Sequence, residues 1–156
     1  MTTSRLIQPD ISDRPFTLTT EHTFHLPARI LYKAWTEEFG KWFASPRSVL
    51  MKPEVDSPFF FETEYKFETK QPARRHPHYG RFLRLSPNKL IKMTWVTGKG
   101  GTEGTETIVT VELSSAGRRT HLQLTHSGFP NKSSRDGHAK AWPEVLRHLE
   151  EVYTRQ

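Results

Sequence analysis

The stretch TETIVTVEL at residues 105–113 is followed by THLQLTHSGFP at residues 120–130, and these two segments decide the fold. In both of them apolar and polar residues alternate, which is typical of β-strands with one buried and one exposed face. The turn residues at 114–117 predict a hairpin in which the two strands are antiparallel. The second strand is expected to end where Ser-Gly-Phe-Pro, at residues 127–130, interrupts the alternation.

A long amphipathic helix is predicted directly after this hairpin, over residues 133–153. Its apolar residues recur at the three- and four-residue spacing of one helical face. They are Trp142, Val145, Leu146, Leu149, Val152 and Tyr153. Pro143 lies inside this segment, so the helix either kinks at Trp142 or begins there, with the proline in its first turn.

The first part of the chain adds a strand and two short helices, followed by further strands. Residues 16–25 alternate as a first strand, and Pro27 is suited to the first turn of a helix. A second short helix is expected to end near residues 40–43. Further strands are predicted at 49–51, 59–67, 79–85 and 90–97, with loops at 70–78 and 98–104. This order predicts an α+β domain with helices on one face of a curved antiparallel sheet.

Length and composition fit one domain. A chain of 156 residues buries roughly 68–70% of its unfolded surface, so we assign residues 15–156 to a single domain. Residues 1–14 are polar and predict a loose N-terminal tail without the apolar core of a secretory signal. No apolar run approaches the roughly 20 residues of a membrane helix. The absence of Cys excludes disulfides and fits a reducing compartment, so we expect a cytoplasmic location with no membrane span.

The formal net charge of +6 raises the question of a nucleic-acid partner. The basic residues occur singly or in pairs, such as Arg74–Arg75 and Arg118–Arg119, with acidic residues between them. This pattern predicts a solvated basic surface and no nucleic-acid partner. The close histidine pairs, His22 with His25 and His76 with His78, lack the helical spacing of a zinc motif, so we expect no metal and no cofactor.

Four segments carry motifs of a known superfamily. PARILYKAWTEEFGKWF at residues 27–43 resembles its opening helical pair, and residues 80–95 resemble its G-x-V-L-x-V-x-P…L-x-x-T-W hairpin. Residues 106–113 are similar to its E-T-x-V-T-V-x-L strand, and residues 120–149 to its T-x-L-x-L-T-H-S-G-F…W…L…L ending. The chain therefore resembles the START-like (Bet v 1-like) superfamily, also called SRPBCC, and within it the heat-shock-protein-90 ATPase activator-homologue branch. The resemblance extends over residues 16–153.

This resemblance implies a helix-grip fold, in which a curved antiparallel sheet of about six to seven strands wraps around the C-terminal helix. Members of the superfamily mostly bind apolar small molecules between sheet and helix, while others are cyclases or co-chaperone domains. Two features depart from the pattern: Ser57-Pro58-Phe59 replaces a frequent Gly-Gly pair, and the basic loop at 70–78 is long. Both lie near the expected mouth of a cavity, so the choice of ligand is not carried over.

The residues predicted to face the interior form the candidate site for an apolar small molecule. Concave sites rich in aromatic residues and poor in polar ones are typical of ligand pockets, although a single aromatic residue is more often core. The set is Trp42, Phe59, Phe61, Tyr65, Tyr79, Met93, Trp95, Val109, Val111, Leu124, His126, Trp142, Leu146 and Leu149.

Catalysis is the second hypothesis. His126 lies on the inward face of its strand and could act as an acid or base in a cyclase- or hydrolase-like reaction, with Tyr65 or Tyr79 as a donor. Ser127 points to the opposite face, and nothing nearby completes a triad. We therefore expect binding rather than catalysis.

A chaperone partner is the third hypothesis. Chaperone activators of this family carry a second domain, so we do not expect that role for this chain. The sequence leaves the identity of the ligand, the volume of the cavity and the oligomeric state open. A homodimer formed through an exposed strand or aromatic patch is as well supported as a monomer.

Overall fold

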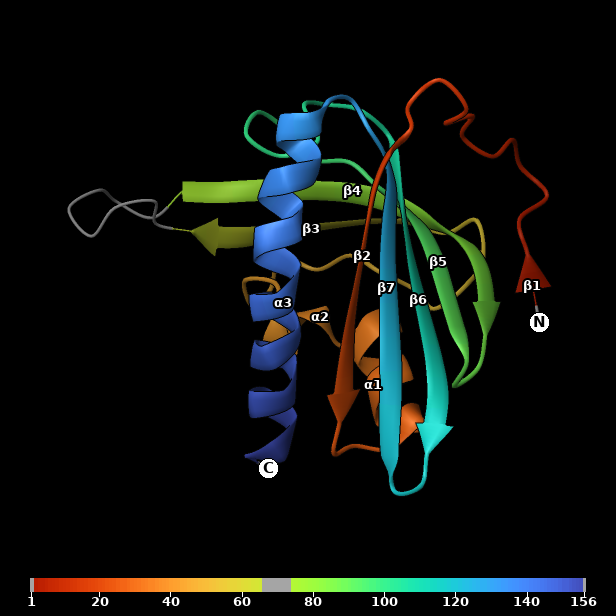
Figure 1. Ribbon diagram of the computed structural model, residues 1–156, viewed down its shortest axis with the longest axis vertical. Coiled ribbons are helices and arrows are strands. Elements are labelled where there is room, and N and C mark those ends of the chain that lie inside the picture. The colour runs from red at the N-terminus through yellow and green to blue at the C-terminus, as the bar shows by residue number, and fades with distance from the viewer. Residues whose placement is uncertain (1, 66–73, 156) are drawn as a thin grey trace.

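The computed structural model describes residues 2–65 and 74–155, and it has the predicted α+β architecture (Figure 1). In chain order the elements are β1 (Thr2–Thr3), β2 (Phe16–Phe24), α1 (Ala28–Thr36), α2 (Phe39–Trp42), β3 (Pro58–Tyr65), β4 (Arg74–Ser86), β5 (Leu90–Trp95), β6 (Thr107–Ala116), β7 (Arg119–Phe129) and α3 (Lys132–Thr154). The strand order is β1-β4-β5-β6-β7-β2, with β3 paired to β4, and every pairing is antiparallel. The prediction of a helix-grip fold is confirmed.

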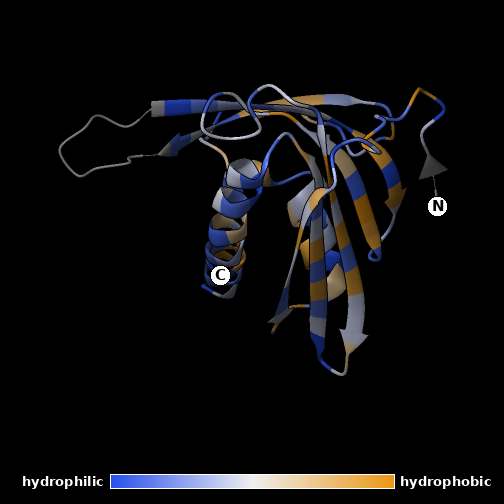
Figure 2. Ribbon diagram, turned by 45° about the horizontal axis from the view of Figure 1, so that its top comes forward, coloured by the Kyte–Doolittle hydropathy of each residue, from blue (hydrophilic) through white to orange (hydrophobic). Residues whose placement is uncertain are grey.

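The sheet buries one face against the helices. Along β7 every second side chain points inward, and Leu122, Leu124 and His126 are fully buried. Figure 2 shows the resulting alternation of hydrophobic and hydrophilic bands on the central strands. The apolar period of two, which identified these strands in the sequence, is therefore the pattern that buries them.

Helix α3 is continuous from Lys132 to Thr154, with Pro143 inside it. The Asn131 side chain caps its start by accepting a hydrogen bond from the backbone N–H of Ser134 at 2.8 Å. This cap excludes the alternative in which the helix begins at Trp142. Among the described residues, none of the helices combines the length and the apolar character needed to cross a lipid bilayer.

Aromatic rings fill the space between the short helices and the sheet. Trp35 of α1 is fully buried, with its ring centroid 5.1 Å from that of Trp42 and 6.0 Å from that of Trp142. The ring centroid of Phe39 in α2 lies 5.0 Å from that of Phe61 in β3. These tilted and edge-to-face contacts connect α1, α2, β3 and α3 in one cluster of buried residues.

The prediction of a loop over the basic segment at residues 70–78 is partly wrong. Residues 70–73 lie outside the described part, but residues 74–78 belong to β4 and pair with Tyr65 to Phe61 of β3. Prolines suggested a loop, yet a proline can occupy a strand that pairs beside a sheet edge, as Pro77 does opposite Glu62. The pairing turns His78 inward, opposite Phe61.

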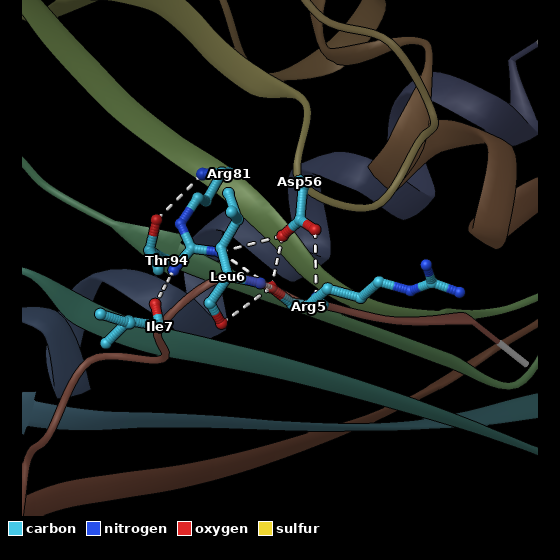
Figure 3. Close-up of polar contacts among 7 residues, drawn as sticks. Arg5, Leu6, Ile7, Asp56, Arg81 and Thr94 are labelled. Atoms are coloured by element: carbon cyan, nitrogen blue, oxygen red, sulfur yellow. Dashed lines mark hydrogen bonds and ion pairs between the residues drawn. The ribbon is translucent and has the colours of Figure 1, made fainter.

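The N-terminal segment differs from the expected loose tail. Residues 2–3 form β1, which pairs with β4. The Arg81 guanidinium donates to Ser4 Oγ and Asp56 Oδ1, each at 3.1 Å, and also to the carbonyl oxygen of Ile7 (Figure 3). Further along, Arg14 donates to the carbonyl oxygens of Gly128 and Glu106, each at 2.8 Å. Long-range polar contacts of this kind leave no periodic signal in the sequence.

Gly80 of β4 lies so close to Thr94 of β5 and Phe59 of β3 that there is no room for a side chain. A Cβ atom at this position would lie 2.2 Å from the carbonyl oxygen of Thr94 and 2.4 Å from Cζ of Phe59. We therefore expect Gly80→Ala to lower the free energy of unfolding by about 1–3 kcal/mol, the usual cost of overpacking. Gly40→Ala is the matched control, because its nearest neighbour would be Val49 Cγ2 at 3.7 Å. Equal urea midpoints for the two variants would contradict the expectation.

Candidate ligand-binding pocket

A pocket of about 530 Å³ opens between the N-terminal half of α3 and the sheet. The end of β3, the start of β4 and the end of β5 form one wall, the first half of α3 forms the other, and the loop after β5 closes one side. The lining residues are Phe43, Thr63, His76, Pro77, His78, Trp95, Thr97, Gly98, Lys99, Gly100, Gly101, Gly137, His138, Ala141, Trp142 and Val145.

The floor of this pocket is aromatic. Trp95 at the end of β5 lies 5.5 Å from Trp142 of α3, measured between ring centroids. Phe43, which follows α2, lies 5.9 Å from Trp95 and 6.1 Å from Trp142. The rings of Phe43, Trp95 and Trp142, from three separate segments, therefore form a continuous apolar surface at the floor of the pocket.

The loop after β5, which the sequence predicted at residues 98–104, is a compact turn held by hydrogen bonds. The backbone N–H of Thr97 donates to Thr102 Oγ1 at 2.9 Å, and that of Thr102 donates to Thr97 Oγ1 at 2.7 Å. The hydroxyl of Ser134 in α3 donates to the carbonyl oxygen of Gly101 at 2.6 Å. These bonds hold the loop against the start of α3, so this wall of the pocket is built in advance of binding.

His78 enters the pocket from β4 in a fixed orientation. Its ring stacks on Phe61 at 4.6 Å and 15°, and its Nδ1 lies 3.0 Å from the backbone carbonyl oxygen of His76. A carbonyl oxygen only accepts, so Nδ1 carries the proton. Burial is the main cause that lowers the pKa of His78 to about 4, and at neutral pH the ring is therefore uncharged.

His138 enters the pocket from α3. Its Nδ1 lies 2.8 Å from the backbone carbonyl oxygen of Ser134, one helical turn earlier, so this nitrogen is also the protonated one. Burial lowers the pKa of His138, and this effect outweighs the opposing effect of the bond to Ser134. His78 and His138, on facing elements of the pocket, are therefore both neutral at neutral pH, and His76 is a third histidine in the lining.

His126 is a structural residue beneath the pocket and does not line it. Its Nδ1 accepts a hydrogen bond from Trp142 Nε1–H at 3.1 Å, because an indole nitrogen only donates. Its Nε2 therefore carries the proton and donates to Thr107 Oγ1 at 2.7 Å, and Thr107 donates to the carbonyl oxygen of Trp95 at 2.5 Å. Burial lowers the pKa of His126 well below its usual value.

The predicted site residues separate into four groups. Trp95 and Trp142 line the pocket. The prediction that Tyr79 faces the interior is wrong, because 51% of it is exposed and it packs on Phe60 on the outer face of the sheet. The side chain of Tyr65 lies outside the described residues. The others are buried core: Trp42, Phe59, Phe61, Met93, Val109, Val111, Leu124, His126, Leu146 and Leu149.

Sequence reasoning did not place His76, His78 or His138, the three histidines in the lining, in the candidate site. His138, Ala141, Trp142 and Val145 recur at the spacing of one helical face, and this signal could have extended the apolar face of α3 toward its start. No comparable signal was available for His78, because its segment was interpreted as a loop. In the described part of the chain, no three His, Asp or Glu side chains gather as metal ligands.

Solved structures share this fold. A protein from Mesorhizobium loti superposes with a TM-score of 0.69 at 22% identity, over 90% of this chain and 98% of its own. The Aha1 dimer from Colwellia psychrerythraea superposes with a TM-score of 0.63 at 17% identity, over 87% of this chain and 94% of its own. DynU16, from the dynemicin biosynthetic locus, gives 0.69 at 14% identity, over 94% of this chain and 48% of its own. These identities are below 25%, so they show the fold alone.

A comparison with curated proteins finds no sequence that matches this chain. The profile of the family described as activator of Hsp90 ATPase homolog 1-like protein matches residues 25–154. This range includes α1, α2, the strands from β3 to β7, and α3. The match covers well over half of the 156 residues. The chain therefore belongs to the family of activator of Hsp90 ATPase homolog 1-like proteins, as its sequence motifs predicted.

Proposed function

We propose that the protein binds an apolar, aromatic small molecule in the pocket between α3 and the sheet. The observation that carries this proposal is the open space of about 530 Å³ with three aromatic rings at its floor. Ligand pockets usually have volumes of about 300–1,000 Å³, apolar walls and few polar groups. The bulky aromatic residues of the core do not fill this space.

The alternative of a cyclase- or hydrolase-like enzyme has less support. Both ring nitrogens of His126 are engaged by Trp142 and Thr107, and His126 does not line the pocket. Tyr79, proposed as a donor, lies on the outer face. An acid or base must come within hydrogen-bond reach of the reacting group, directly or through a water, and neither residue has that access.

A possible homodimer, the absence of a chaperone role and a cytoplasmic location stay predictions. The solved Aha1 from Colwellia psychrerythraea is a dimer, which makes a homodimer worth testing for this chain. The outer face of the sheet offers an exposed apolar pair, Leu50 and Tyr79, on which two copies could meet. Sedimentation equilibrium measures this directly.

Filling the pocket from α3 tests the proposed function. A Cβ atom at Gly137 would meet nothing within 4 Å, so Gly137→Leu should project into the pocket without displacing the core. We expect it to weaken binding of the neutral fluorescent probe N-phenyl-1-naphthylamine by at least about tenfold, which corresponds to 1.4 kcal/mol. The measurement is a fluorescence titration of the purified protein.

Lys140→Leu is the matched control, because it adds the same side chain to an exposed position of α3 outside the pocket. It should bind the probe as the unmodified chain does. The proposal is wrong if the unmodified protein fails to bind the probe, or if Gly137→Leu binds it unchanged.

A further inference from the structure

His78 and His138, two of the three histidines that line the pocket, share a feature that the proposed function does not use. His78 and His138 each direct Nδ1–H to a backbone carbonyl oxygen, at 3.0 and 2.8 Å. In a neutral imidazole the second nitrogen is then an acceptor with a free lone pair. Neither Nε2 atom has a hydrogen-bond partner among the described residues, although both rings line the pocket. Two acceptors on facing walls of a mostly apolar pocket therefore lack donors.

The rings cannot easily turn to present a donor instead. His78 is stacked on Phe61 and has its ring edge-to-face with Trp95, at 5.3 Å between centroids. His138 lies 4.9 Å from Phe129 and 5.0 Å from His126. A flip of either ring would replace Nδ1–H by a C–H group at the backbone carbonyl oxygen, and the other tautomer would set a bare Nδ1 lone pair against it. The acceptor atoms are therefore fixed in place before any ligand arrives.

Two other polar residues of the pocket, Thr97 and Lys99, do not reverse this preference. Thr97 Oγ1 is already bonded to the backbone of Thr102. Lys99 is exposed at the rim, where solvent screens its charge. An anionic ligand group placed at either Nε2 would set oxygen lone pairs against a nitrogen lone pair. A neutral donor satisfies such an acceptor without the cost of burying a charge in an apolar pocket.

We infer that the molecule bound in this pocket is a neutral aromatic compound with a hydroxyl or N–H group, which donates a hydrogen bond to Nε2 of His78 or His138. This inference rests on the proposed function and specifies the chemistry of its ligand. The aromatic floor holds the ring system, and the histidines select the donor. A ligand of the same shape without the donor leaves both acceptors unpaired.

A pair of matched probes tests the inference. 2-Naphthol and 2-methoxynaphthalene have the same ring system, and the ether lacks the donor. We expect the protein to bind 2-naphthol about tenfold more tightly, the effect of one buried hydrogen bond, and to bind naphthalene-2-carboxylate most weakly. Displacement of N-phenyl-1-naphthylamine measures all three affinities. If neither naphthol nor ether binds, the proposed function fails; if both bind equally, this inference alone fails.

Variants assign the preference to the histidines. His78→Phe with His138→Phe keeps aromatic rings in place and removes both acceptors, so the ratio of the two affinities should fall to about one. His148→Phe, at an exposed position of α3, should keep the ratio. A spectroscopic test needs no variant: saturation with 2-naphthol should shift the ¹⁵N resonance of Nε2, more than that of Nδ1, in His78 or His138. Unchanged Nε2 resonances at saturation would overturn the inference.

Discussion

Trp142→Ala is expected to lower the free energy of unfolding by about 3–5 kcal/mol, the usual cost of removing a buried tryptophan. For a chain of this size the loss corresponds to a fall of about 10 °C in the melting temperature. Trp142 is 3% exposed, packs on Trp35 and Trp95, and donates to Nδ1 of His126. One substitution therefore removes a ring from the core and leaves a buried acceptor without its donor.

Trp142→Phe separates these two causes. Phenylalanine keeps a ring but lacks the N–H group, so we expect an intermediate loss that includes about 1–3 kcal/mol for the unpaired Nδ1 of His126. His148→Ala, on the exposed side of the same helix, should lie within about 0.5 kcal/mol of the unmodified chain. Differential scanning calorimetry gives the three values. A loss below about 1 kcal/mol for Trp142→Ala would mean that α3 does not pack as described.

Acid should destabilise the fold before the carboxylates are protonated. Burial lowers the pKa values of His78, His126 and His138 in the folded state. Above about pH 6.5 these side chains are neutral in both the folded and the unfolded state, so their protonation does not change the free energy of unfolding. As the pH falls below 6.5, these histidines become protonated in the unfolded chain but stay neutral in the folded chain. The free energy of unfolding therefore falls.

For His78 this loss continues down to its folded pKa of about 4. Between pH 7 and pH 5 it amounts to about 2 kcal/mol from His78 alone, and His126 and His138 add to it. Urea denaturation at both pH values measures the change. His78→Phe should reduce it and His148→Gln should not, because His148 is exposed. Equal stability of the unmodified chain at pH 7 and pH 5 would contradict the neutral assignment of these rings.

Periodicity explains which parts of the fold could be predicted. The alternation in residues 105–113 and 120–126 and the helical spacing around Leu146 reflect burial on one face, so they identify β6, β7 and α3 directly. The docking of residues 2–14 depends on single polar contacts, such as that between Arg81 and Asp56, and these have no period. The start of β4 was hidden by Pro77, which interrupts a strand pattern without ending the strand.

The pocket was harder to predict than the fold, for a physical reason. Alternation shows that a side chain faces inward, but a core position and a pocket position look alike from one strand. Leu124 and Trp95 were both predicted to line the site; Leu124 is packed core, whereas Trp95 borders open space. That difference depends on how far α3 stands from the sheet at each level, which is a property of the assembled structure.

The central claim is that an aromatic molecule binds between the N-terminal half of α3 and the wall formed by the end of β3, the start of β4 and the end of β5. Its most direct test is a ¹H–¹⁵N correlation spectrum of the labelled protein, titrated with 2-naphthol. The account predicts the largest shifts at the backbone amides of residues 97–101 and 137–142 and at the indole N–H of Trp142. Shifts confined to the outer face around Phe60 and Tyr79, or no saturable shifts at all, would contradict it.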